Sequence, residues 1–152
     1  MPLFARPNND LVTTGWTNLA GSGSNLFQAS DEGSGDTADY IKNLVQDSPQ
    51  LYQCGASSVS DPLASTGHMI TVVAAQLNCP GIANRLIFKL KQGAVEVCSS
   101  NQALTDGNII TYTYTLTGGE ADAITNYGDL SITINGSKIT ELDFDLRVYQ
   151  GF

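Results

Sequence analysis

The chain has 152 residues, a length that fits one folded domain with a substantial buried core. Charged residues make up only 14% of it, and 7 Lys and Arg against 15 Asp and Glu leave a net charge of −8. Nucleic acids and anionic membrane surfaces attract clustered cations, so this balance argues against both as partners. Polarity comes instead from 15 Gly, 13 Ser, 14 Thr and 11 Asn, a composition typical of strands and turns and not of a helical bundle.

The N-terminus and the cysteines indicate a protein of a reducing cytoplasm. The first residues lack the basic segment and apolar run of a secretory signal peptide, and no stretch reaches the roughly 18 apolar residues of a membrane span. Cys54, Cys79 and Cys98 are an odd number without a Cys-x-x-Cys pair, which favours free thiols. A Cys54–Cys79 or a Cys79–Cys98 bridge remains open on spacing alone.

Residues 1–66 are rich in proline, glycine and acids and contain only short apolar pieces. Because Pro2 and Pro7 disfavour helix, residues 1–12 are predicted to form an extended N-terminal arm, followed by one domain over 13–152. The first part of that domain is expected to be rich in loops. A single short helix is expected, if anywhere, between Asp36 and Leu44, where Asp36 could act as the N-cap.

Strand patterns dominate residues 67–152. Residues 69–77 form an apolar, β-branched run, and five further segments alternate apolar and polar positions: 85–91, 94–99, 109–116, 130–134 and 139–149. In 94–99 the alternation predicts that Val95 and Val97 face inward and that Glu96 and Cys98 face outward. Gln92-Gly93 and Asn135-Gly136 are predicted hairpin turns.

Strands of this length and spacing, each with one apolar face, predict antiparallel sheets that bury those faces against one another. We therefore expect an all-β protein, an antiparallel β-sandwich of jelly-roll-like type with a loop-rich N-terminal part.

Candidate chemistry in the sequence is sparse. The single histidine, His68, begins a strand. The sequence has no Gly-x-Ser-x-Gly element that would supply a serine nucleophile, so a structural or exposed role is favoured for His68. The acids near Gly33 and Gly35 (Asp31, Glu32, Asp36 and Asp39) lack EF-hand spacing, and a solvated turn is favoured there over a calcium site. Glu141, Asp143 and Asp145 share one strand face, as an outward polar face would. We expect no enzyme and no metal or other cofactor.

Several short motifs follow one another in a recognisable order. They are Arg6-Pro7-Asn8-x-Asp10, Gly15-Trp16-Thr17, Leu26-Phe27, Asp31-Glu32, Asp39-Tyr40-Ile41 and, late in the chain, Tyr127-x-Asp129-Leu130. This order resembles a module of tailed-bacteriophage structural proteins, in which such segments precede a series of sandwich strands. Tyr127 stands where that late segment often has Trp.

The resemblance implies a virion component without catalytic residues. Its signature residues have structural roles: Trp16, Asp31, Glu32, Asp39, Tyr40, Ile41, Asp129 and Leu130. Trp16 and Tyr40 are expected to fill core or inter-sheet corners, while Asp31 and Asp39 accept backbone hydrogen bonds in turns and Ile41 faces inward.

The function that the resemblance implies is a capsid decoration (cement) protein. Such a protein is made in the bacterial host cytoplasm and lies on the outer capsid surface. Its partners are the major capsid protein and further copies of itself, as a homotrimer or homodimer. The alternatives are a carbohydrate- or receptor-binding module of the tail, with Tyr127, Asn126 and Asp129 as the candidate glycan contacts, and a tail or neck connector.

Overall fold

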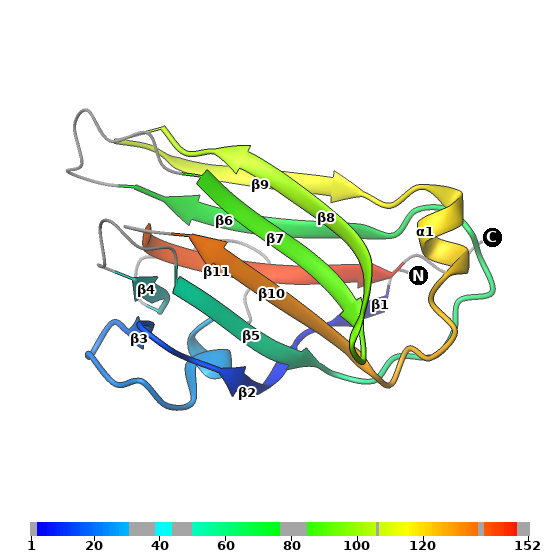
Figure 1. The fold of residues 1–152 in the computed structure, drawn as a ribbon, viewed down its shortest axis with the longest axis horizontal. Helices are drawn as coiled ribbons and strands as arrows, with labels where there is room; N and C mark the ends of the chain where they lie inside the picture. The colour runs from blue at the N-terminus through cyan, green and yellow to red at the C-terminus, as the bar shows by residue number, and fades with distance from the viewer. Residues whose placement is uncertain are drawn as a thin grey trace.

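The computed structural model describes residues 3–30, 39–43, 50–76, 85–105, 107–136 and 139–148, with residues 140, 141 and 143–148 described as backbone only. The protein is all-β, and its strands form two antiparallel sheets that lie one behind the other (Figure 1). Buried side chains from both sheets form a single core cluster between them. The predicted all-β class and antiparallel sheets are therefore confirmed.

Sheet A contains six strands. Along its main path the order is β3 (Thr17–Asn18), β4 (Ile41–Asn43), β11 (Ile139–Val148), β6 (Met69–Ala75) and β9 (Ile109–Thr115). The sixth strand, β1 (Leu3–Ala5), pairs with the end of β11.

Sheet B contains five strands, in the order β2 (Pro7–Val12), β5 (Gln50–Ala56), β10 (Leu130–Gly136), β7 (Arg85–Gln92) and β8 (Val95–Ala103). From β4 to β11 the chain passes between the two sheets at almost every connection. Only β7 and β8 are consecutive and paired within that series. Their connection is a tight turn in which Gly93 takes a φ of +56°, a conformation that glycine adopts without steric cost.

The core is built from the inward stripe of each strand. Its largest fully buried side chains include Trp16 near β3, Tyr52 on β5, Phe88 on β7, and Ile132 and Ile134 on β10. β10 lies between β5 and β7, so even its outward Ser131 and Thr133 are buried. The strand predictions for 69–77, 85–91, 109–116 and 130–134 are thus confirmed within the described residues.

The helix prediction was wrong for the part that the structure describes. Ile41–Asn43 form strand β4, whereas residues 31–38 and Leu44 lie outside the described residues. The described residues contain a 3₁₀ turn, η1 (Leu26–Ala29), and one α-helix, α1 (Gly118–Asp122). Thr117 and Glu120 form a reciprocal capping box, which explains how a helix begins at two glycines.

The facing predicted for 94–99 was wrong at Val95 and Cys98, whereas Val97 packs against the core and Glu96 is exposed, as predicted. Cys98 is buried and Val95 is 68% exposed. The pairing shifts between Leu90↔Cys98 and Lys91↔Glu96, which leaves Val97 as an extra residue in β8. One extra residue reverses the facing of every side chain beyond it, because side chains alternate with a period of two.

Asn135-Gly136 does not form the predicted hairpin turn. Both residues lie within β10, and β10 and β11 belong to different sheets. A Cβ atom on Gly136 would collide with Ile139 Cδ1, so a larger residue here would have to displace a buried side chain. Asn43 Nδ2 donates to Gly136 O (2.9 Å), so the end of β10 in sheet B is bonded to β4 in sheet A.

Residues 3–12, predicted as an arm, are extended and pair within both sheets. β1 pairs with β11, and β2 pairs with β5. The same segment therefore contributes one strand to each layer of the sandwich.

The account of the core predicts a large difference between two isoleucines of sheet B. Ile132→Ala should lower the free energy of unfolding by about 2–5 kcal/mol, because Ile132 is 1% exposed and its loss leaves a cavity. Ile87→Ala, on the outward face of β7, should cost less than half as much. Urea denaturation of both variants measures this, and equal losses would contradict the assignment of the two faces.

Candidate functional site

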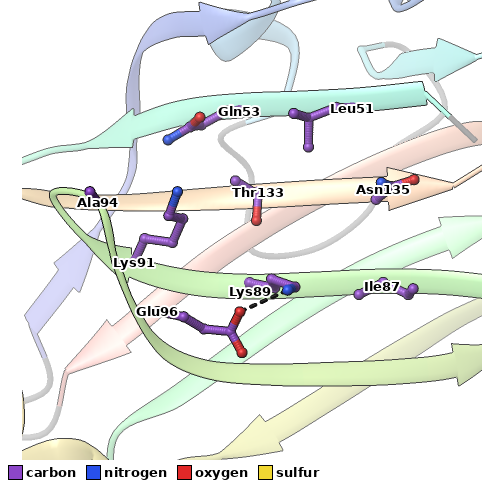
Figure 2. A pocket seen from close by; sticks show the side chains of 9 residues that line it. All are labelled: Leu51, Gln53, Ile87, Lys89, Lys91, Ala94, Glu96, Thr133 and Asn135. Carbon is purple, nitrogen blue, oxygen red and sulfur yellow. Dashed lines mark hydrogen bonds and ion pairs between the residues drawn. The ribbon is translucent and has the colours of Figure 1, made fainter.

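A hollow of about 450 Å³ lies on the outer face of sheet B and is open to solvent. Figure 2 shows that its lining side chains come from β5, β10, β7 and the start of β8. The lining residues are Leu51, Gln53, Ile87, Lys89, Lys91, Ala94, Glu96, Thr133 and Asn135. Those on β5, β7 and β10 are brought together by alternation, because each points away from the core on a strand whose neighbours point inward. Ala94 comes from the turn between β7 and β8, and Glu96 from the start of β8.

Cations gather on this face. Arg85, Lys89 and Lys91 all lie on the outward side of β7, as their spacing in the sequence predicted. They are three of only seven cations in a chain with a net charge of −8. Lys89 Nζ is 2.7 Å from Glu96 Oε2, the one carboxylate of the lining.

Apolar and amide groups complete the surface. Leu51 is 37% exposed, and Ile87, on the far side of Asn135 in the sheet, is partly buried. Gln53 Nε2 donates to Ser131 Oγ (3.1 Å), which holds its amide in place between β5 and β10. The surface thus offers aliphatic contact, amide hydrogen bonds and positive charge on a rigid sheet.

The lining chemistry suits binding. Among the nine residues there is no His, Cys, Ser or Tyr, and the single carboxylate is engaged by Lys89. The other polar groups of the lining, two lysines, two amides and the Thr133 hydroxyl, can form hydrogen bonds or ion pairs with a partner.

His68 lies in the core, away from this surface. It is fully buried, and its Nε2 is 2.7 Å from the Tyr127 hydroxyl. Burial lowers the pKa of His68, against the opposing effects of the Thr66 backbone and of the Asp61 and Asp122 carboxylates. Burial also raises the pKa of Tyr127 to about 12. A neutral histidine bonded to a tyrosine 59 residues away is a structural link between the start of β6 and the loop before β10.

Tyr127 is therefore wrong as a glycan contact. Its ring is 6% exposed and cannot stack on a sugar, although Asn126 and Asp129 are exposed. Asn126 Oδ1 accepts from Gly128 N (3.0 Å) within the same loop. Asp129 O accepts from Gly93 N (3.0 Å) in the turn between β7 and β8.

Two cysteines are buried free thiols, as predicted: Cys54 and Cys98. Burial raises the pKa of Cys98 to about 11 and raises that of Cys54 further. Both are thus protonated at neutral pH and unreactive. Cys79 lies outside the described residues.

The signature residues that the structure describes do not form one site. Trp16, Ile41 and Leu130 are buried in the core, and Trp16 Nε1 donates to Gln50 O (3.1 Å). Tyr40 and Asp39 are partly buried, so Tyr40 does not fill the core, whereas Asp129 is exposed. Asp31, Glu32 and Asp36 lie outside the described residues. Among the residues that are described, no three His, Cys, Asp or Glu side chains are grouped to hold a metal.

Asp10 is the residue whose role the sequence motif did not reveal. Its carboxylate accepts from the backbone N–H groups of Leu26 (2.8 Å) and Phe27 (2.9 Å) and from the Tyr52 hydroxyl (3.0 Å). It thereby fastens η1 onto strands β2 and β5.

Comparison with known proteins adds no relative. The chain matches no protein-family model, and no curated protein sequence is similar to it. Neither helix in the described part of the chain is long and apolar enough to span a membrane.

The buried His68 predicts a pH-dependent stability. Its pKa in the folded protein is below its ordinary value of 6.5, so the unfolded chain binds the proton more readily. The stabilising contribution is complete above pH 6.5 and decreases as the pH falls through and below that value. Chemical denaturation across this range should show a weaker pH dependence in His68→Gln than in the unsubstituted protein, and equal dependence would contradict the assignment.

Proposed function

We propose that this protein is a non-enzymatic structural component of a tailed-phage virion. Its role would be that of a capsid decoration (cement) protein, which bridges and stabilises major capsid subunits on the outer head surface. The order of motifs from Arg6 to Leu130 supports the virion class. The open outer face of sheet B, without a catalytic array among its lining residues, supports binding as the activity.

We further infer that the fold is of jelly-roll type. Eight strands support this, with the orders β4-β11-β6-β9 and β5-β10-β7-β8 in the two layers. This winding, in which the chain alternates between layers, is what two interleaved Greek keys produce.

The observation that carries the proposed function is the surface of nine residues on sheet B, here called the sheet B surface. It is positively charged on a chain whose net charge is −8. A partner with acidic groups would complement it, and a protein surface fits better than nucleic acid. One of its two lysines is already paired with Glu96, and phosphate backbones need more cations than remain.

In this role the rigidity of the sheet matters more than strong individual contacts. Each copy would contact adjoining capsid subunits through the sheet B surface, and many modest contacts over a lattice would add. The outward pressure of packaged DNA would then be distributed over many copies of the protein, each with a close-packed core of low compressibility.

The alternative functions are a carbohydrate- or receptor-binding module of the tail and a tail or neck connector. The sheet B surface favours decoration over glycan binding, because none of its nine residues is aromatic. Sugar sites commonly rely on an exposed aromatic face.

Quantitative mass spectrometry of virions whose genome encodes this chain tests the proposed function. Decoration predicts a copy number comparable to that of the major capsid protein, both in virions and in purified empty heads. A few tens of copies that separate with the tails would contradict it.

A charge reversal tests the sheet B surface itself. Lys91→Glu should reduce the occupancy of heads at least about tenfold, since a like charge would face the acidic partner. Lys42→Glu makes the same change on β4 of the other sheet, where Lys42 Nζ contacts Leu19 O (3.3 Å), and should leave occupancy unchanged. Equal effects of the two substitutions in a head-binding assay would exclude this surface as the contact.

A further inference from the structure

Strand β9 forms an open edge of sheet A. Within the described part of the chain it pairs with β6 alone, in unbroken antiparallel register from Met69↔Thr115 to Ala75↔Ile109. In Figure 1, β9 is the outermost strand of its layer. A row of backbone donors and acceptors therefore faces outward along seven residues.

The hydrogen-bond pattern identifies which residues carry these free groups. Leu116 N donates to His68 O (2.9 Å), and bonded positions alternate along an antiparallel pair. Ile110, Tyr112 and Tyr114 thus face β6 with their backbone groups. The N–H and C=O groups of Ile109, Thr111, Thr113 and Thr115 point away from the sheet.

β9 lacks the features that prevent edge strands from pairing. From Ile109 to Thr117 there is no charged residue and no proline, and its register has no bulge. The other long edges are protected: β8 carries Glu96 and a bulge, and β2 carries Pro7, Asp10 and two register shifts. β3 has only two residues.

The sequence of β9 reads almost the same in both directions. Thr111-Tyr112-Thr113-Tyr114-Thr115 is a palindrome about Thr113, and Ile110 and Leu116 extend it with aliphatic residues. In a twofold-symmetric interface residue i contacts residue j of the partner and j contacts i. Antiparallel pairing of this edge with a second copy about Thr113 therefore places threonine opposite threonine and tyrosine opposite tyrosine.

We propose that two copies of this chain associate through their β9 edges, antiparallel and centred on Thr113, to join the two copies of sheet A into one continuous sheet. Thr113 would pair with its own counterpart, and Thr111 with the partner's Thr115. About six ladder hydrogen bonds would form between outward groups that are free of β6.

The side chains of β9 fit this pairing. Each Tyr112 would lie opposite the partner's Tyr114, at the positions where cross-strand side chains approach most closely. Both rings are held beforehand: Tyr112 OH donates to Ala103 O (3.1 Å) and Tyr114 OH to Glu120 Oε1 (2.8 Å). The exposed threonines would form a cross-strand row on the outer face, with no like charges opposed.

This inference does not depend on the virion role. It concerns an edge of sheet A, whereas the proposed capsid contact lies on sheet B. It also selects a dimer over a trimer, because antiparallel pairing of one edge with itself closes after two copies.

Sedimentation equilibrium of the purified chain tests the dimer. At about 100 μM, where a micromolar association is nearly complete, the mass should be twice the monomer value of 16.1 kDa. Thr113→Lys should give a monomer, because two ammonium groups would meet at the twofold axis. Thr113→Pro should do the same by removing an outward N–H that β6 does not use. Ser99→Lys, an exposed position on the edge strand β8, is the matched control and should remain a dimer.

Circular dichroism and thermal melts establish whether each variant is folded. If Thr113→Pro does not fold, the mass of Thr113→Lys alone tests the dimer. A monomeric or trimeric unsubstituted protein, or a dimer that survives Thr113→Lys, would overturn the proposal.

Disulfide crosslinking tests the register. In a Cys79→Ser background, Thr113→Cys should crosslink to itself under mild oxidation. Thr111→Cys should crosslink with Thr115→Cys of a second variant but far less with itself. Equal self-crosslinking at 111 and 113 would overturn the register centred on Thr113.

Discussion

The burial of one face of each sheet against the other is the constraint from which the rest of this structure follows. Phe88, Tyr52, Ile132 and Ile134 project from sheet B into the same core cluster as Ile70 and Val72 of sheet A. Successive side chains on a strand point to opposite faces of the sheet. The positions that fill the core therefore also determine which side chains lie on the outer face. The row of Arg85, Lys89 and Lys91 is the outward half of the pattern whose inward half is Leu86, Phe88 and Leu90.

The same constraint explains which buried polar groups are present. Trp16, Tyr52 and His68 enter the core with hydrogen-bonding atoms, and each has a partner from a distant part of the chain: Gln50, Asp10 and Tyr127. These bonds connect loops to sheets at several points of the sandwich. They give Trp16, Tyr52 and His68 structural roles in the core.

The sequence predicted the strands well wherever alternation was regular, as at 85–91 and 109–116, because side-chain periodicity is a local property. The prediction failed where the facing of a side chain depends on how strands far apart in the sequence pair. A single extra residue, Val97, reversed the predicted facing of Cys98, and no local signal marks that bulge. Asn135-Gly136 has the composition of a hairpin turn, yet both residues lie within β10, and β10 and β11 belong to different sheets. The cations of the candidate surface were predicted to face outward. The strands that lie beside β7 could not be predicted, because alternation along one strand does not specify which strands pair with it.

A cryo-electron microscopy reconstruction of the virion that encodes this chain measures the position and orientation of the protein together. The account predicts density for the sandwich on the outer head lattice, with Lys91 and the rest of the sheet B surface against the major capsid protein. Density confined to the tail, or a sandwich on the head whose sheet B surface faces solvent, would contradict it.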